Sequence, residues 1–273
     1  MGLKQYQKNT IKTIEEFFAE YKSAQIAVAK LREVSPEHAV TIASQDFSRA
    51  IFSSIKPSIN YFSYSNPEGQ YYPNLTIKAP TGAGKTLLAI ETINSYFDKL
   101  LEGKKTGLVV WMVHRETIFN QTIHRLRDKN DFYRQTLEFY FGNNVLIKTK
   151  GDSITQNELE NNIVILFIML QSASRKNKEN LKIFKDNGRY INSIFPQDYE
   201  YAKHKELLEK MPYLDKFADS QSLQPQIKTS LGNLIRICKP LIIVDEYHRF
   251  FSKLGIELLD SLNPDTIIGF TAT

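Results

Sequence analysis

Cysteine is almost absent from this sequence, and long hydrophobic runs are absent altogether. The single cysteine among the 273 residues is Cys238, so an intrachain disulfide is impossible and a cysteine-based metal site is not expected. The longest apolar run, at 163–170, is too short to cross a bilayer, and the first residues form no apolar signal segment. We therefore expect a cytoplasmic protein with no membrane segment.

Overall composition is that of an ordinary globular protein with a mild excess of positive charge. Hydrophobic residues make up 42% of the chain and charged residues 24%. The net charge is +5, and the isoelectric point is near 9.0. Such an excess suits a polyanionic partner, but a basic protein with no such partner agrees equally well with the charge.

The most informative stretch is residues 79–86, Ala-Pro-Thr-Gly-Ala-Gly-Lys-Thr, between a predicted strand and a predicted helix. The apolar residues 75–77 before it are typical of a buried strand, and residues 87–93 after it carry apolar side chains at helical spacing. A strand, a glycine-containing turn and a helix N-terminus form an anion-binding site, because backbone N–H groups converge there and the helix dipole adds positive potential. An ordinary turn before a helix is the less specific interpretation.

Residue types within this loop fit the triphosphate of a nucleotide. Gly82 and Gly84 let the backbone approach a phosphate without a Cβ atom in the way. Lys85 can reach the β- and γ-phosphates, and the hydroxyl of Thr86 can bind Mg²⁺. Alanine stands at the first position of the motif, where the general pattern has glycine. The loop residues that we predict to bind the nucleotide are Thr81, Gly82, Ala83, Gly84, Lys85 and Thr86.

Strands and helices alternate along the chain, which predicts an α/β fold. Apolar runs without in–out alternation indicate buried strands at 75–77, Gly107–Val113, Ile163–Met169, 241–244 and 266–270. Shorter strand candidates are 137–141 and 145–148. With helices between them, such strands form a mostly parallel sheet that is covered on both faces.

Two regions do not follow this alternation, and we interpret them as insertions at 22–72 and 175–236. After an amphipathic helix at 3–21, helical character continues with a restart at Ser35-Pro36-Glu37, and an aromatic loop follows at 57–74. The second region is lysine-rich and helical in propensity. Its basic residues either contact phosphates or form a solvated helix face: Lys176, Lys178, Lys182, Lys185 and Arg189.

A second group of polar residues, Asp245-Glu246-Tyr247-His248, follows the predicted strand at 241–244. In a parallel sheet, ligands bind at the carboxyl ends of the strands. Phosphoryl transfer needs a carboxylate that holds Mg²⁺ and a group that orients the attacking water. Asp245 can serve as the first, through a metal-bound water, and Glu246 as the second, a general base. Acidic pairs at strand ends are also common by chance, so the phosphate loop upstream strengthens this interpretation.

Taken in order, these motifs resemble those of superfamily-two (DEAD/DEAH-box) helicases and translocases. The loop at 79–86, Asp245-Glu246-x-His248 and Thr271-Ala272-Thr273 resemble motifs I, II and III. Leu3-Lys4-x-Tyr6-Gln7 resembles the Q motif, with lysine where arginine is usual. Residues 113–121 resemble motif Ia, and 168–172 stand where a further strand-end motif occurs.

The resemblance implies a RecA-like P-loop NTPase with ATP and Mg²⁺ as cofactors. It implies that Gln7 reads the adenine edge, with Tyr6 nearby in the nucleotide site, and that His248 links the ATP site to Thr271 and Thr273. The residues that it assigns to nucleic acid are His114, Arg115, Gln121, Gln171 and Ser172. Plainer interpretations stay open, in which Gln7 is a surface residue, His248 is structural, the threonines only end a strand, and His114 and Arg115 start a solvated helix.

Among the branches of this superfamily, the Asp-Glu-Tyr-His box resembles the motor (Res) subunits of type III restriction enzymes, as do residues 184–190 and 195–196 more weakly. This implies movement on DNA, with a nuclease or a methyltransferase as a candidate partner. Members continue into a second RecA-like lobe that these 273 residues lack, so we expect a fragment, a single domain at 1–273, that hydrolyses ATP slowly or not at all. The alternatives are an RNA helicase, a small-molecule kinase and a catalytically silent module that binds nucleic acid.

Overall fold

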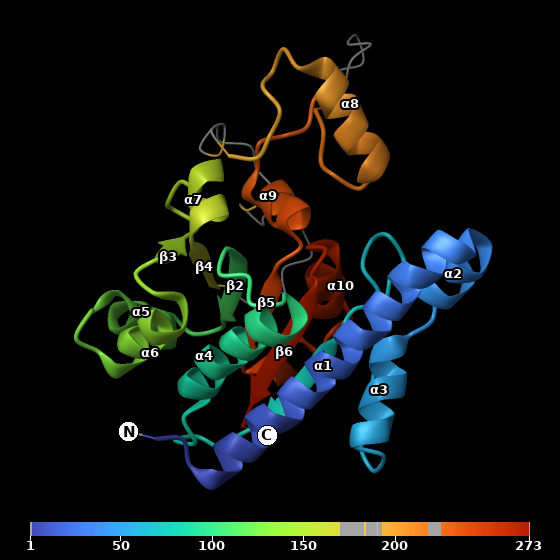
Figure 1. The fold of residues 1–273 in the computed structure, drawn as a ribbon. Coiled ribbons are helices and arrows are strands. Elements are labelled where there is room, and N and C mark those ends of the chain that lie inside the picture. Colours follow the sequence, from blue (N-terminus) through green and yellow to red (C-terminus); the bar gives the residue numbers. More distant parts are fainter. Residues whose placement is uncertain (1, 170–182, 184–189, 191–192, 218–224, 273) are drawn as a thin grey trace.

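The centre of the molecule is a six-stranded sheet in the order β1-β6-β5-β2-β4-β3, in which all neighbours are parallel (Figure 1). The computed structural model describes residues 2–169, 183, 190, 193–217 and 225–272, and the sheet is that of this part of the chain. Its strands are β1 (Asn74–Lys78), β2 (Gly107–Val113), β3 (Val145–Thr149), β4 (Ile163–Met169), β5 (Leu241–Asp245) and β6 (Thr266–Thr271). The predicted α/β fold is confirmed.

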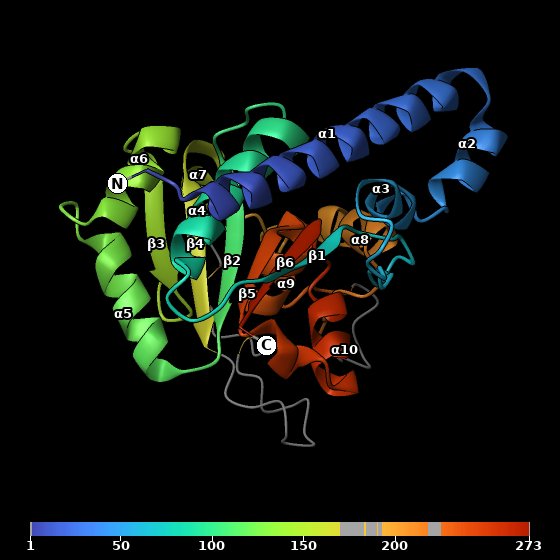
Figure 2. The same ribbon diagram turned by 90° about the horizontal axis from the view of Figure 1, so that it is seen from below.

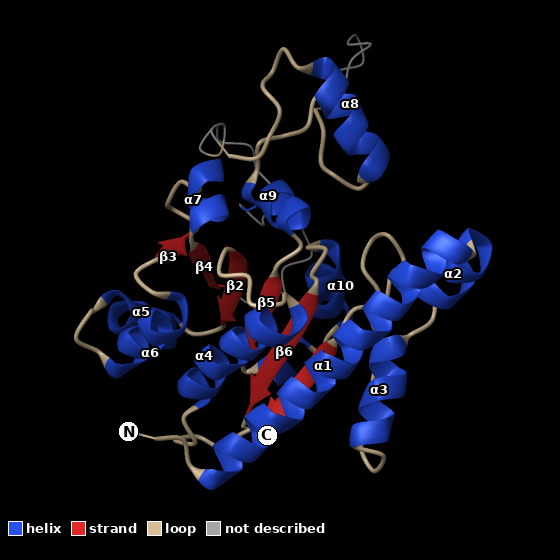
Figure 3. Ribbon diagram, viewed as in Figure 1, coloured by secondary structure: helices blue, strands red, loops and turns tan. Residues whose placement is uncertain are grey.

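Helices cover both faces of the sheet (Figure 3). On one face lie α1 (Gln5–Val34), α4 (Lys85–Ser95), the π-helical turn η1 (Tyr96–Leu100), α5 (Glu116–Arg127) and α6 (Phe132–Phe141). On the other lie α7 (Gln156–Asn161), α9 (Leu231–Cys238), the 3₁₀ helix η4 (Tyr247–Phe250) and α10 (Lys253–Ser261). The remaining described helices are α2 (Pro36–Ala43), α3 (Phe47–Ile55) and α8 (Tyr201–Lys210).

Alternate residues of the central strands belong to the two different cores. Val109 and Trp111 of β2 pack in the core with α1, α4, α5 and α6, whereas Val110 and Met112 pack with α7, α9 and α10. Because both faces are covered, every position must be apolar, which explains the continuous apolar runs. The architecture is a three-layer α/β/α arrangement, as RecA-like domains have.

The strand predicted at 137–141 is wrong, because these residues form the second half of α6. Leu137 and Phe141 are 0% and 4% exposed, and a spacing of four residues puts them on the same side of a helix. The side chain of Asp131 caps the helix by accepting a hydrogen bond from the N–H of Tyr133. The strand candidate at 145–148 is confirmed as β3.

The regions interpreted as insertions differ in how far they join the core. α1 runs unbroken to Val34 and extends past the sheet toward α2 (Figure 2), and its last buried residue is Tyr21. The predicted restart is confirmed, since Pro36 is the first residue of α2. α8 stands apart from the sheet (Figure 1), but α9 buries Leu234 and Ile235 completely in the second core.

Across the part of the chain that the structure describes, no helix combines the length and the apolar character needed to cross a membrane.

Candidate nucleotide site

Three of the strands bring the sequence motifs to one edge of the sheet. β6 lies between β1 and β5. Lys78 at the end of β1 pairs with Thr271 of β6, and Asp245 at the end of β5 pairs with Phe270. Since the carboxyl edge of a parallel sheet is where ligands bind, the phosphate loop, the acidic box and Thr271 lie around one candidate site.

The phosphate loop has the shape that an anion requires. Gly82 and Gly84 have φ angles of +79° and +78°, in the left-handed region. Gly84 caps α4, so the N–H groups of the first turn, which have no partners within the helix, lie at the loop. A Cβ added at Gly82 would meet nothing within 4 Å, whereas one at Gly84 would lie 2.7 Å from Nε2 of Gln7. The loop therefore leaves open space on one side and packs tightly on the other.

Glu246 connects the loop with the end of β6. Its Oε1 atom is 3.0 Å from Nζ of Lys85, and its Oε2 atom is 3.5 Å from Nδ1 of His248. The same Nδ1 atom is 2.9 Å from Oγ1 of Thr271. The side chains of Lys85 and Glu246 are 17% and 20% exposed, so the ion pair is shielded but solvent can reach it. Glu246 and His248 together thus link the phosphate loop, the acidic box and Thr271 at the end of β6.

Asp245 carries a carboxyl group whose charge is only partly compensated. Burial raises its pKa, the positive charge of Lys85 opposes this, and the net result is a pKa above the ordinary value. Its Oδ1 atom accepts a hydrogen bond of 3.1 Å from the N–H of Glu246. A divalent cation would supply the missing positive charge.

The residues present fit a magnesium ion that arrives with a nucleotide. The described residues contain no group of three or more His, Cys, Asp or Glu side chains that would hold a metal without other ligands. Mg²⁺ in nucleotide sites is typically bound by one or two protein oxygens together with substrate phosphates and water. Asp245 and the hydroxyl of Thr86, next to Lys85 at the start of α4, match this donor set.

Tyr6 and Gln7 contact the phosphate loop itself. The Tyr6 hydroxyl and the Gln7 amide both donate hydrogen bonds to the carbonyl of Ala83, the second at 2.9 Å. The Gln7 amide oxygen accepts a hydrogen bond from the N–H of Lys4. Gln7 is only 4% exposed, so the interpretation of it as a surface residue is wrong. Its contact with adenine stays a prediction.

His114 and Arg115 follow β2, the strand beside β5. Arg115 is exposed at the N-terminus of α5. Nε2 of His114 is 3.3 Å from Nη1 of Arg249, which lies one residue after the acidic box. Burial and the nearby charges of Arg249 and Arg115 lower the pKa of His114. A neutral imidazole can therefore accept the hydrogen bond from the guanidinium group.

The other residues predicted to contact nucleic acid are less close together. Gln121 is exposed on α5, six residues after Arg115 and so about 9 Å along the helix axis. It lines a shallow surface hollow together with Asn120, His124 and Arg125. Gln171, Ser172 and Thr273 lie outside the described residues, as do the basic residues Lys176, Lys178, Lys182, Lys185 and Arg189.

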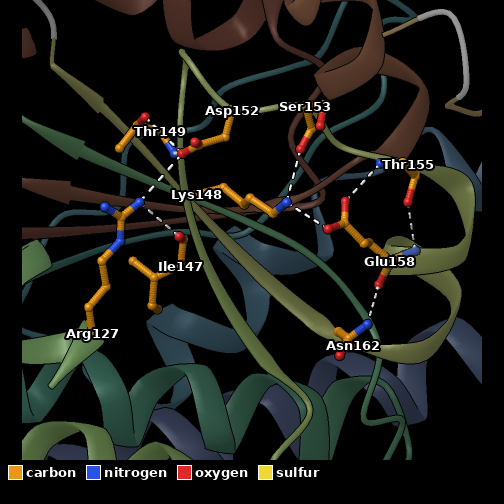
Figure 4. Close-up of polar contacts among 9 residues, drawn as sticks. All are labelled: Arg127, Ile147, Lys148, Thr149, Asp152, Ser153, Thr155, Glu158 and Asn162. Atoms are coloured by element: carbon orange, nitrogen blue, oxygen red, sulfur yellow. Dashed lines mark hydrogen bonds and ion pairs between the residues drawn. The ribbon is translucent and has the colours of Figure 1, made fainter. Parts of the chain in front are cut away.

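A further polar network, which we did not predict, fixes the turn between β3 and α7 (Figure 4). Oδ2 of Asp152 accepts hydrogen bonds from the N–H and the hydroxyl of Thr149, at 2.7 and 2.9 Å. Glu158 binds Nζ of Lys148 at 2.6 Å and accepts a hydrogen bond from the N–H of Thr155. Thr155 and Glu158 form a capping box, and their spacing in the sequence is typical of one. β3 and β1 are the two outer strands, so this network is remote from the phosphate loop.

Four further residues make contacts around the site that their sequence context did not lead us to expect: Tyr247, Gly269, Asn74 and Arg249. Only Gly269 carries a local signal, because a glycine inside an apolar strand indicates the close approach of another group. The other contacts join segments that are far apart along the chain.

The fold and the site define the class: a RecA-like P-loop NTPase domain of the helicase and translocase superfamily. Compared with models of protein families, residues 1–273 match the type III restriction enzyme, Res subunit. The chain belongs to this family, which consists of ATP-dependent, helicase-like motors. A comparison with curated proteins gives no significant match.

Proposed function

We propose that residues 1–273 are the ATP-binding lobe of a motor that couples ATP hydrolysis to movement on double-stranded DNA, in a system of the type III restriction-modification kind. The observation that carries this proposal is the 3.0 Å contact between Lys85 and Glu246, because it brings the phosphate loop against the acidic box. Membership in the Res family supports DNA, rather than RNA, as the polymer.

Each residue at the edge of the sheet then has a role toward the nucleotide. The loop from Thr81 to Thr86 holds the phosphates with its backbone N–H groups and with Lys85. Thr86 and Asp245 bind Mg²⁺, and Tyr6 and Gln7 lie beside the loop for adenine. Bound ATP supplies the phosphoanhydride bond whose hydrolysis drives the motor.

Glu246 is the general base of this proposal. Its carboxylate is partly exposed and, once Lys85 turns to a phosphate, is free to accept a proton from water. His248 stays hydrogen-bonded to Thr271, so a change at Glu246 is passed to the end of β6. His114, Arg115 and Gln121 contact the DNA backbone from the neighbouring β2–α5 segment.

Calorimetry with a non-hydrolysable ATP analogue and Mg²⁺ tests the proposal. Lys85→Ala should weaken binding by about 10- to 100-fold, since a hydrogen bond to a charged group contributes about 1.5–3 kcal/mol. Lys148→Ala is a matched control, because Lys148 is also 17% exposed and ion-paired but lies on β3. Equal affinity of the parent and Lys85→Ala proteins would reject the site.

A further inference from the structure

Tyr247, inside the acidic box, is folded back onto the sheet. Glu246 has a φ angle of 54°, in the left-handed region that glutamate rarely adopts. The chain therefore turns sharply after β5, and Tyr247 begins the 3₁₀ helix η4. Tyr247 is 2% exposed and belongs to the core shared with α9 and α10, whereas Asp245, Glu246 and His248 are only partly buried.

Gly269 of β6 provides the space for this ring. A Cβ atom built on Gly269 would lie 2.1 Å from Cδ1 and 2.3 Å from Cγ of Tyr247, so no other residue fits at this position while the ring stays in place. Glycine weakens a strand, and here it follows Ile267 and Ile268 in a fully buried one. The Tyr247 ring occupies the space that a side chain at position 269 would need.

Asn74, the first residue of β1, holds the other end of the ring. Its Nδ2 atom donates a hydrogen bond of 2.9 Å to the Tyr247 hydroxyl, and that hydroxyl donates one of 3.1 Å to Oδ1 of Asn74. Asn74 is 8% exposed, so both bonds are buried. Tyr247 follows β5, packs on β6 and bonds to β1, which are the three strands whose ends form the nucleotide site.

We propose that Tyr247 is a positioning residue for Glu246 and His248. Gly269 leaves the space that its ring occupies, and Asn74 holds its hydroxyl group by hydrogen bonds. The inference rests on the proposed function, because it explains how the general base is held. Glu246 precedes the ring in a left-handed backbone conformation, and His248 follows it. A displaced ring would therefore move both the contact of Glu246 with Lys85 and the contact of His248 with Thr271.

Three variants separate positioning from simple core packing. Gly269→Ala fills the space next to the Tyr247 ring and should displace the ring. The double variant Tyr247→Ala with Gly269→Ala relieves the crowding but has no ring to hold its neighbours, so it should not reverse the effect, whereas simple core packing predicts a reversal. Tyr247→Phe keeps the ring but removes both hydrogen bonds to Asn74. Tyr96→Phe is the matched control, since Tyr96 is 3% exposed and donates its hydroxyl hydrogen bond to Asp265, at the opposite end of β6.

The first measurement needs no nucleotide. The chain has five histidines, so the imidazole signals of His248 can be assigned in NMR spectra by one substitution at that position. Gly269→Ala should shift these signals, the double variant should not bring them back, and Tyr96→Phe should leave them in place. Unchanged His248 signals in Gly269→Ala, or a full return in the double variant, would overturn the proposal.

The second measurement follows turnover and affinity of the same proteins with Mg–ATP. Misplacing a catalytic group by about 1 Å costs about 10²-fold in rate, so kcat should fall by that order in Gly269→Ala and stay low in the double variant. Kd for the ATP analogue should not rise, because the phosphate loop is intact and a displaced Glu246 competes less for Lys85. An equal loss in kcat and affinity would instead indicate general unfolding of the site and would contradict positioning.

Failure of the positioning role is distinguishable from failure of the proposed function. If the parent protein binds no nucleotide, the proposed function fails, while the NMR comparison still decides the role of Tyr247. If Gly269→Ala does not fold, Tyr247→Phe decides. Shifted His248 signals would support the positioning role of the hydrogen bonds between Tyr247 and Asn74, and signals identical to those of the parent would overturn the proposal.

Discussion

The ion pair between Lys85 and Glu246 makes a prediction about nucleotide affinity. In the structure, Nζ of Lys85 lies 3.0 Å from Oε1 of Glu246. A lysine that holds this carboxylate is not free to hold a phosphate, so the nucleotide has to displace Glu246. Glu246→Gln should therefore bind the Mg–ATP analogue more tightly than the parent, although it loses hydrolysis.

The size of the effect follows from the environment of the pair. A hydrogen bond to a charged group contributes about 1.5–3 kcal/mol. Glutamine keeps a hydrogen bond from the ammonium group but loses the attraction between opposite charges, and the side chains are 17% and 20% exposed, so screening of that attraction is partial. Glu246→Gln should weaken the contact that holds Lys85 by roughly 1 kcal/mol, which corresponds to an affinity for the Mg–ATP analogue about fivefold higher.

Two assays check this prediction. Calorimetry gives the affinity of each protein, with Glu158→Gln as control, because Glu158 forms a similar ion pair with Lys148 on β3. Urea unfolding of the Lys85→Met, Glu246→Gln and double variants, without nucleotide, should give a coupling free energy of about 1 kcal/mol. A coupling of zero, or weaker nucleotide binding by Glu246→Gln, would refute the reasoning.

Three further predictions follow from other contacts. Arg249→Gln removes a cation beside His114, so an NMR titration should show the pKa of His114 rising toward its ordinary value; an unchanged pKa would mean that the contact is absent in solution. Burial raises the pKa of Asp152, but the hydrogen bonds from Thr149 and the charge of Arg127 outweigh it, and the pKa lies below its ordinary value. A carboxyl group with a lowered pKa stabilises the fold above its unfolded pKa, and this effect is lost as the pH falls through its folded pKa. Urea unfolding should therefore show that the parent loses more stability than Asp152→Asn between about pH 6 and pH 3. Leu137→Ala should lower the free energy of unfolding by about 2–5 kcal/mol, and Phe139→Ala, at a position 83% exposed, should lower it far less; similar losses would contradict the helix assigned to 132–141.

The fold was predictable because its signals are local. Each central strand is a continuous apolar run, such as the residues 163–169, and this pattern requires a sheet that is covered on both faces. The loop at 79–86 is recognisable because the residues before it indicate a strand and those after it indicate a helix. Residues 137–141 were assigned wrongly because a short run with Leu, Phe and Tyr fits either period, and Leu137 and Phe141 satisfy the helical one.

The detailed shape of the site was not predictable, because it depends on residues that are distant in the sequence. Asn74 and Tyr247 are 173 positions apart, and His114 and Arg249 are 135 positions apart. Neither pair has a spacing that marks it. Gln7 was singled out only through a resemblance; its amide is buried against the carbonyl of Ala83, and its contact with adenine stays a prediction.

The most direct test of the nucleotide site is a crystal structure of the chain with Mg²⁺ and a non-hydrolysable ATP analogue. We expect the phosphates in the loop 81–86, Lys85 turned from Glu246 to a phosphate oxygen, and the metal between Thr86 and Asp245. A nucleotide bound elsewhere, with the ion pair between Lys85 and Glu246 intact, would contradict the account.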